Sequence, residues 1–167
     1  GGGMLISWQS HPVLHDVTIA HNSAAGSGGG IYCDYAIPIF DSINRCDIFL
    51  NNAYRANDVY SDYYIKVVVD TFTVLFPTEY HVEHFNLFNF DVLNGKLEQI
   101  DADLYVSPEG DNTNSGFTPV DPLKTIRFAF SKIMTNSQNQ NAIHLLEGTY
   151  SPSTNGEIFP LYMPDYY

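Results

Sequence analysis

Two stretches of the chain repeat the same order of glycine, apolar and polar positions. The first begins at residues 1–6 (GGGMLI) and the second, 27 residues later, at residues 28–33 (GGGIYC). Each glycine triplet leads to a proline-marked apolar run and then to a short alternating run that ends in an asparagine turn. Self-similarity at this period predicts stacked repeats, because one coil cannot bury its apolar face without a neighbour.

The two copies align with a changing offset. Pro12 and Pro38 lie 26 residues apart, whereas Asn22 aligns with Asn51 or Asn52, 29 or 30 residues on. The second copy therefore carries a small insertion near 42–45. The glycine triplets are expected to let coils approach closely, and the asparagines to form a hydrogen-bonded ladder between coils.

The pattern changes over residues 63–100. Apolar residues fill or alternate along 65–69, 72–76 and 88–92, and Pro77 and Asn94-Gly95 interrupt them. Proline cannot donate to a sheet ladder, and Asn-Gly is typical of a hairpin turn. This segment is predicted to form antiparallel strands that close the open edge of the coil stack.

Residues 101–167 combine strands with one helix. A strand from Asp103 precedes the loop 109–116, and Asp121 and Pro122 suit the N-cap and first position of a helix. Apolar residues at 123, 126, 130 and 133 form one stripe, which predicts a short helix over about 122–135. A second strand is expected over 142–146.

Both halves show a resemblance. The residues Gly-Gly-Gly-Ile-Tyr, Pro-Ile-Phe and Asn-Asn-Ala resemble the coils of secreted right-handed parallel β-helix proteins, of the polymorphic outer-membrane and adhesin-like type found on bacterial surfaces. Residues 104–150, with Tyr-Val-Ser-Pro, Asp-Pro-Leu-Lys-Thr-Ile and Leu-x-Gly-Thr-Tyr, resemble the N-terminal segment whose helix caps such a stack.

The resemblance implies a mainly β chain of three parts and an extracellular or cell-surface location. Two β-helix coils would occupy 1–62, the closing segment 63–100, and the start of a second, truncated β-helix 101–167. The sequence shows no signal peptide and no apolar run long enough for a transmembrane helix. Because it begins at Gly1 and ends where further coils are expected, the chain is interpreted as a fragment of a longer surface protein. Its exposed coil edges are expected to favour self-association.

The net charge of the chain limits the classes of partner that it can bind. Nineteen acidic residues against seven basic ones give a formal net charge of −12. Such a balance disfavours nucleic acids and anionic membranes, and makes Ca²⁺ the expected metal ahead of Zn²⁺. No nucleotide-binding motif is present. Cys33 and Cys46 either pair or each point into the core of the repeat.

The first functional hypothesis is a module that binds carbohydrate or a partner chain. Aromatic side chains of the coils would supply stacking platforms and neighbouring polar groups would supply hydrogen bonds. The candidate binding residues are Trp8, His15, Tyr32, Asp34 and Tyr35, with further tyrosines at 60, 63 and 64.

The second hypothesis is a metal-dependent hydrolase or lyase that acts on a polysaccharide, or on a small ester or lactone, through metal-activated water. His81 and His84 would be metal ligands and Glu83 the general base. The alternative is a pair of solvated histidines at a sheet edge.

The loop 109–116 is a further candidate metal site. Glu109, Asp111 and Asn114 offer oxygen ligands of the kind that Ca²⁺ requires. The alternative is an Asx-rich turn that orders the connection between strand and helix.

Overall fold

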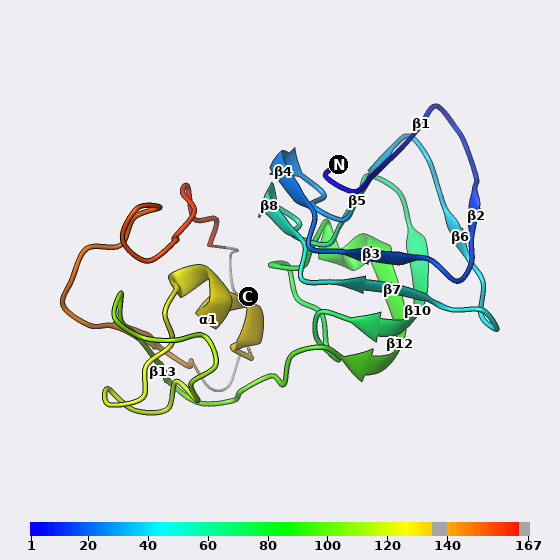
Figure 1. Cartoon of the computed structure of the whole chain (residues 1–167). Helices are drawn as coiled ribbons and strands as arrows, with labels where there is room; N and C mark the ends of the chain where they lie inside the picture. Colours follow the sequence, from blue (N-terminus) through cyan, green and yellow to red (C-terminus); the bar gives the residue numbers. More distant parts are fainter. Residues whose placement is uncertain (135–139, 164–167) are drawn as a thin grey trace. The chain divides into compact units, whose positions relative to one another are not determined.

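The computed structural model describes residues 1–134 and 140–163, and the chain divides into two compact units. Unit 1 is Gly1–Glu98 and unit 2 is Gln99–Tyr167. The strands of unit 1 are β1 (Met4–Ser7), β2 (Val13–Leu14), β3 (Thr18–Ala20), β4 (Ser23–Ser27), β5 (Ile31–Asp34), β6 (Ile39–Phe40), β7 (Cys46–Phe49), β8 (Asn52–Arg55), β9 (Val59–Ser61), β10 (Ile65–Phe72), β11 (Val82–Glu83) and β12 (Phe88–Gly95), with the 3-10 helix η1 (Phe85–Leu87) before β12 (Figure 1).

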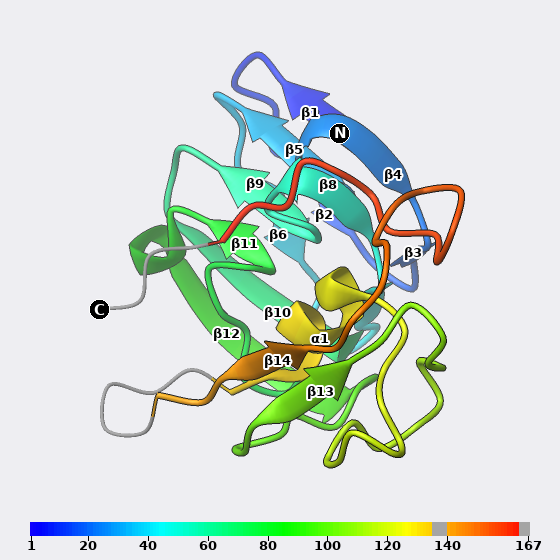
Figure 2. The same cartoon turned by 90° about the vertical axis from the view of Figure 1, so that its left-hand side faces the viewer.

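Unit 1 is a parallel β-solenoid, as the repeat predicts. Each strand of the first coil (1–27) pairs in parallel with the corresponding strand of the second coil (28–55). The third coil (56–79) and a final pass (80–98) complete the sheets β1-β5-β9-β11 and β3-β7-β10-β12. Figure 2 shows β1, β5, β9 and β11 following one another along the stack.

The register confirms the insertion in the second coil. Met4 pairs with Ile31 and Val13 with Ile39, but Thr18 pairs with Asp47, so the offset grows from 26 to 29 between β6 and β7. The Asp41 carboxylate accepts hydrogen bonds from the backbone N–H groups of Ile43 and Asn44 and so orders the inserted turn. The extra residues therefore form an outward loop and leave the stacked strands in register.

Arg45, at the end of this loop, ties the second coil to the final pass. Its guanidinium forms a two-pronged ion pair with Asp91, both N–O distances being 3.0 Å, and also donates to the Val69 carbonyl. These charge-assisted bonds lower the pKa of the Asp91 carboxyl. The insertion thus supplies a clamp along the axis of the stack.

The closing segment is parallel, and the prediction of an antiparallel sheet is wrong. β10 pairs in parallel with β7 on one side and with β12 on the other, where Ile65 lies opposite Phe88. Asn94 and Gly95, predicted to form a hairpin turn, lie inside β12 opposite Thr71 and Phe72. The repeat continues here without a glycine triplet, so alternating strands look the same in the sequence whichever way they pair.

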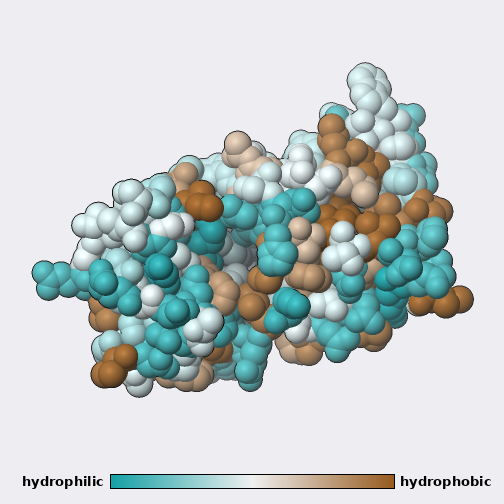
Figure 3. All heavy atoms as spheres, viewed as in Figure 1, coloured by the Kyte–Doolittle hydropathy of each residue, from teal (hydrophilic) through white to brown (hydrophobic). Residues whose placement is uncertain are grey.

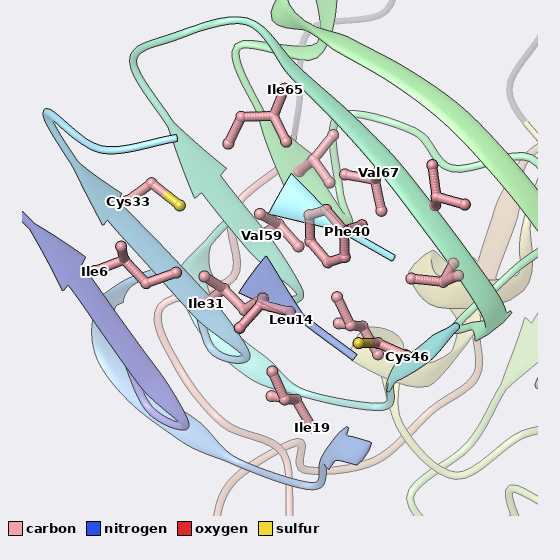
Figure 4. Packing of buried hydrophobic residues seen from close by; sticks show 14 of the residues in the cluster. Ile6, Leu14, Ile19, Ile31, Cys33, Phe40, Cys46, Val59, Ile65 and Val67 are labelled. Carbon is pink, nitrogen blue, oxygen red and sulfur yellow. The ribbon is translucent and has the colours of Figure 1, made fainter. Parts of the chain in front are cut away.

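Every second side chain along the strands points inward, and these side chains fill the core of unit 1. Isoleucines, valines and both cysteines from successive coils stack in the interior (Figure 4). Cys33 and Cys46 are buried and free, and burial raises the pKa of Cys33 to about 12. Both thiols therefore act as small apolar side chains.

Apolar side chains also gather over the first coil, around β1–β3, in the space-filling view (Figure 3). Met4 and Val17 pack on the core of unit 1 but are only partly buried. The apolar interior therefore reaches the surface at this end of the solenoid.

A polar ladder runs beside the apolar core. Asn22 donates through Nδ2 to Asn51 Oδ1 (3.1 Å), and Asn51 donates through Nδ2 to Asp58 Oδ1 (3.1 Å). The expected contact between the asparagines of successive coils is confirmed. The Asp58 side chain is fully buried, and its Oδ2 has no hydrogen-bond partner within the residues described.

The glycine triplets stack directly on one another and on the third coil. The N–H groups of Gly2 and Gly3 donate to the carbonyls of Gly28 and Gly29, and that of Gly29 donates to the Ala56 carbonyl. A Cβ on Gly29 would collide with the carbonyl oxygens of Asn52 and Asn57, and Gly28 has a φ of 67°. The crowding at Gly29 requires glycine, and the left-handed conformation of Gly28 favours it.

Unit 2 contains β13 (Leu104–Val106), α1 (Ile126–Lys132) and β14 (Ile143–Leu145). β13 and β14 are parallel, and with α1 they enclose a core that includes Leu104, Val106 and Leu123. This arrangement has the predicted order of strand, loop, helix and strand.

The helix is shorter than the predicted range 122–135, whose last residue lies outside the described part. Its N-cap is Thr125, which accepts from the Phe128 N–H, and Leu123 instead bridges in parallel to Val106. The Asp121 carboxylate accepts from Ser115 rather than from the helix. Bridge formation with β13 therefore outweighs the local preference for a helix start at Asp121.

The first turn of α1 receives a further cap from the segment after β14. The buried Glu157 carboxylate accepts hydrogen bonds from the backbone N–H groups of Ile126 (2.6 Å) and Arg127 (3.4 Å). A carboxylate at this position complements the dipole of the helix. No helix in the part of the chain that the structure describes is long and apolar enough to cross a membrane.

Candidate functional site

The outward face of sheet β1-β5-β9-β11 repeats the same side chains in the second and third coils. In β5, Ile31 and Cys33 are buried, so the intervening Tyr32 and the following Asp34 point outward. Strand β9 repeats this order, with Tyr60 between two buried residues. Because Tyr32 pairs with Tyr60 in register, equivalent side chains form columns along the solenoid.

Three aromatic residues follow the strands of this sheet and form an exposed column. Trp8 lies beside Tyr35, since the N–H groups of Trp8 and Gln9 donate to the carbonyls of Asp34 and Tyr35. The rings of Tyr35 and Tyr63 are 6.1 Å apart between centroids and inclined by 60°. The exposed fractions of Trp8, Tyr35 and Tyr63 are 88%, 64% and 42%, so a large part of each aromatic side chain in this column is open to solvent.

The neighbouring column is packed differently. Tyr32 and Tyr60 stack nearly parallel, with centroids 4.6 Å apart, and His84 meets the other side of Tyr60 at 5.7 Å. One face of the Tyr32 ring, expected from the sequence to be a stacking platform, is therefore covered by Tyr60.

Carboxylates lie between the two aromatic columns. Asp34 and Asp62 each follow one of the paired residues Cys33 and Ser61. The Tyr60 hydroxyl donates to Asp62 Oδ1 at 3.0 Å, and His84 Nε2 is 3.5 Å from the same oxygen. Asp34 and Asp62 are thus equivalent positions of neighbouring coils.

A third carboxylate, Glu83, is in register with Tyr60 and forms an ion pair with Arg55 (3.0 Å). The negative field of this surface affects its tyrosines. The pKa of Tyr32 is raised, first by burial and then by Asp62, Asp34 and Glu83. Burial and the bond to Asp62 raise the pKa of Tyr60 as well.

We call Trp8, Asp34, Tyr35, Asp62 and Tyr63 the aromatic–acidic face. An exposed aromatic ring can pack against the C–H face of a sugar, and a carboxylate can accept hydrogen bonds from hydroxyl or ammonium groups. Repetition along the solenoid lets a linear ligand meet equivalent groups about every 4.8 Å.

The structure brings together Trp8, Tyr32, Asp34 and Tyr35, four of the five binding residues proposed from the sequence. His15 follows β2 on another side of the coil. Hydrogen bonds from the backbone N–H groups of Asn44 and Ile43 are the main cause of the lowered pKa of Asp41, and His15 makes a small further contribution.

Asp62, the position equivalent to Asp34 in the third coil, was not predicted as part of the site. The signal is present, because residues 59–63 (VYSDY) repeat residues 31–35 (IYCDY) with an offset of 28. The third coil lacks a glycine triplet, having Asn57 and Asp58 where the second has Gly29 and Gly30. Without this marker, the third copy of the repeat is hard to recognise in the sequence.

The candidate metal ligands around β11 are not gathered. His81 is buried, and its Nδ1 lies within hydrogen-bond distance of the Thr78 backbone N–H and hydroxyl. Glu83 pairs with Arg55, while His84 faces Asp62 and Tyr60. Within residues 1–134 and 140–163, no three His, Cys, Asp or Glu side chains form a group that could hold a metal.

The loop 109–116 is ordered by its own side chains. Asp111 Oδ1 accepts from the Thr113 backbone N–H, which is an Asx turn, and Asn114 donates to the Pro122 carbonyl. Hydrogen bonds from Thr113 lower the pKa of Asp111. Asp111 and Asn114 thus serve the connection to α1, and Glu109 is exposed beside them.

The sequence resembles a known protein family within unit 2. Residues 108–167 match the family described as "Protein of unknown function (DUF1565)". The match covers less than half of the chain. No curated protein and no solved structure matches the sequence.

Proposed function

We propose that unit 1 is a carbohydrate-binding module of a secreted or cell-surface β-helix protein, and that its aromatic–acidic face holds the glycan. The observation that carries this proposal is the column Trp8, Tyr35 and Tyr63, exposed and in register over three coils. A soluble fold gains little from three solvent-exposed aromatic side chains in a row unless they meet a partner.

The position of the column favours a linear ligand. Sugar rings that stack on Tyr35 and Tyr63 place their hydroxyl groups beside Asp34 and Asp62, which accept hydrogen bonds. The platforms follow adjacent strands that pair in parallel, so their spacing is set before the ligand binds.

The test is calorimetric titration of the whole chain with a panel of glycan oligomers. The variants Trp8→Ala and Tyr35→Ala should each weaken binding at least about tenfold, because each removes a ring face. The matched control is Ile43→Ala, which removes an apolar side chain of 87% exposure on another face and should bind like the wild type.

Equal binding by the wild type and both aromatic variants would overturn the proposal. The proposal would also be overturned if the chain bound a protein partner and no glycan. The aromatic–acidic face would then be assigned to a partner chain.

A further inference from the structure

The aromatic–acidic face carries more negative than positive charge, and this bears on which glycan it takes. Its carboxylates are Asp34 and Asp62, with Glu83 in the next register position. The basic groups beside them are Arg55, paired with Glu83, and His84, next to Asp62.

We infer that the preferred ligand is a cationic glycan, whose sugars carry free amino groups, held by Asp34 and Asp62 between the stacking platforms. This inference rests on the proposed function and names the class of sugar for the same site.

The carboxylates are placed to meet successive sugars. Asp34 and Asp62 follow paired residues of adjacent strands, so they are separated by about one strand spacing of 4.8 Å along the solenoid. The exposed rings of Tyr35 and Tyr63 are the next residues in the chain. Each of these two coils therefore offers an exposed aromatic ring and a carboxylate to one part of a linear ligand.

The same charges disfavour an acidic polysaccharide. A uronic acid stacked on Tyr35 would bring its carboxylate beside Asp34, and the chain as a whole has a formal net charge of −12. Repulsion between like charges rejects such a ligand even where its ring geometry suits the platform.

The experiment measures how tightly the whole chain binds three oligomers of equal length. These are oligomers of glucosamine, of N-acetylglucosamine and of galacturonate. Calorimetry at low and at high salt should show roughly tenfold tighter binding of the glucosamine oligomer than of its neutral N-acetylated form. The preference should shrink at high salt, because these charges are exposed to solvent.

Two variants of equal charge separate the face from the net charge of the chain. Asp34→Asn/Asp62→Asn should abolish the preference for glucosamine, whereas Asp16→Asn/Glu98→Gln, which neutralises two exposed carboxylates elsewhere, should retain it. Trp8→Ala should weaken both the glucosamine and the N-acetylated oligomer by the same factor.

The outcomes distinguish the two proposals. Equal or tighter binding of the N-acetylated or galacturonate oligomer, still sensitive to Trp8→Ala, would overturn the cationic preference and leave carbohydrate binding in place. If both double variants reduced the preference for glucosamine equally, the preference would come from the net charge of the chain, and the inference would be overturned. Failure of all three oligomers, with other glycans still bound through Trp8, would overturn it too.

Discussion

Asp58 occupies the position in the third coil where the second coil has Gly30, and its carboxyl group is buried in the polar ladder. Burial raises its pKa to about 7, although hydrogen bonding to Thr73 and Asn51 offsets part of the effect. The group is thus protonated in the folded state at mildly acidic pH, at which an unfolded aspartate is already ionised.

This pKa predicts that stability falls as pH rises. A raised pKa means that the folded state binds more protons, so the contribution of Asp58 is fully present below about pH 4 and is lost by about pH 7. The upper limit of the loss is about 4 kcal/mol. Asp58→Asn, which mimics the neutral carboxyl, should be more stable than the wild type at pH 7.5 and similar to it at pH 4.

Urea unfolding at several pH values measures this difference. Asp16→Asn, at an exposed position, is the control and should follow the wild type. A constant difference between Asp58→Asn and the wild type from pH 4 to 7.5 would show that Asp58 does not titrate in this range.

At the scale of single residues, the sequence predicted the close approach of coils from the repeated order Gly-Gly-Gly. It also selected Tyr32 and Asp34 as binding residues, which the structure places on the outward face of β5. It did not reveal that Tyr32 stacks on Tyr60, because that contact depends on the register of β5 against β9.

The coils themselves depend on glycine at contacts between strands. Gly29→Ala would place a methyl group against the carbonyl oxygens of Asn52 and Asn57, so the backbones of two coils must separate. We expect this substitution to destabilise unit 1 by more than about 2 kcal/mol.

Gly26→Ala provides the matched control. Gly26 lies in β4, and no atom lies within 4 Å of the position that an added methyl group would take, so the substitution should be neutral or stabilising by up to about 1 kcal/mol. Thermal unfolding of both variants measures the contrast, and equal melting temperatures would argue against the stacked glycine triplets.

At the scale of elements, prediction succeeded for the repeat and failed for its continuation. The changing offset located the insertion at 42–45, because proline and asparagine mark both copies. The strands of 65–95 lack these markers, and a strand that pairs in parallel has the same alternation as one that pairs in an antiparallel hairpin. The start of α1 was misplaced because Leu123 bridges to Val106, a contact distant in the sequence.

At the scale of the whole molecule, two units with separate cores share one chain. Unit 1 carries the aromatic–acidic face, while unit 2 has the predicted order of strand, loop, helix and strand. The mainly β class and the parallel solenoid were predictable, since they follow from repetition. The placement of Asp34 and Asp62 at equivalent positions was not predictable, because the third coil was not recognised in the sequence.

The fluorescence of Trp8 tests the central claim most directly, because Trp8 is the sole tryptophan in the chain and lies in the proposed binding face. The indole is 88% exposed, so its emission should resemble that of a solvated tryptophan. Titration with a glucosamine oligomer should shift the emission to shorter wavelength in a saturable manner, as a sugar ring displaces water from the indole. Unchanged emission across the glycan panel, from protein shown to be folded, would contradict carbohydrate binding at this face.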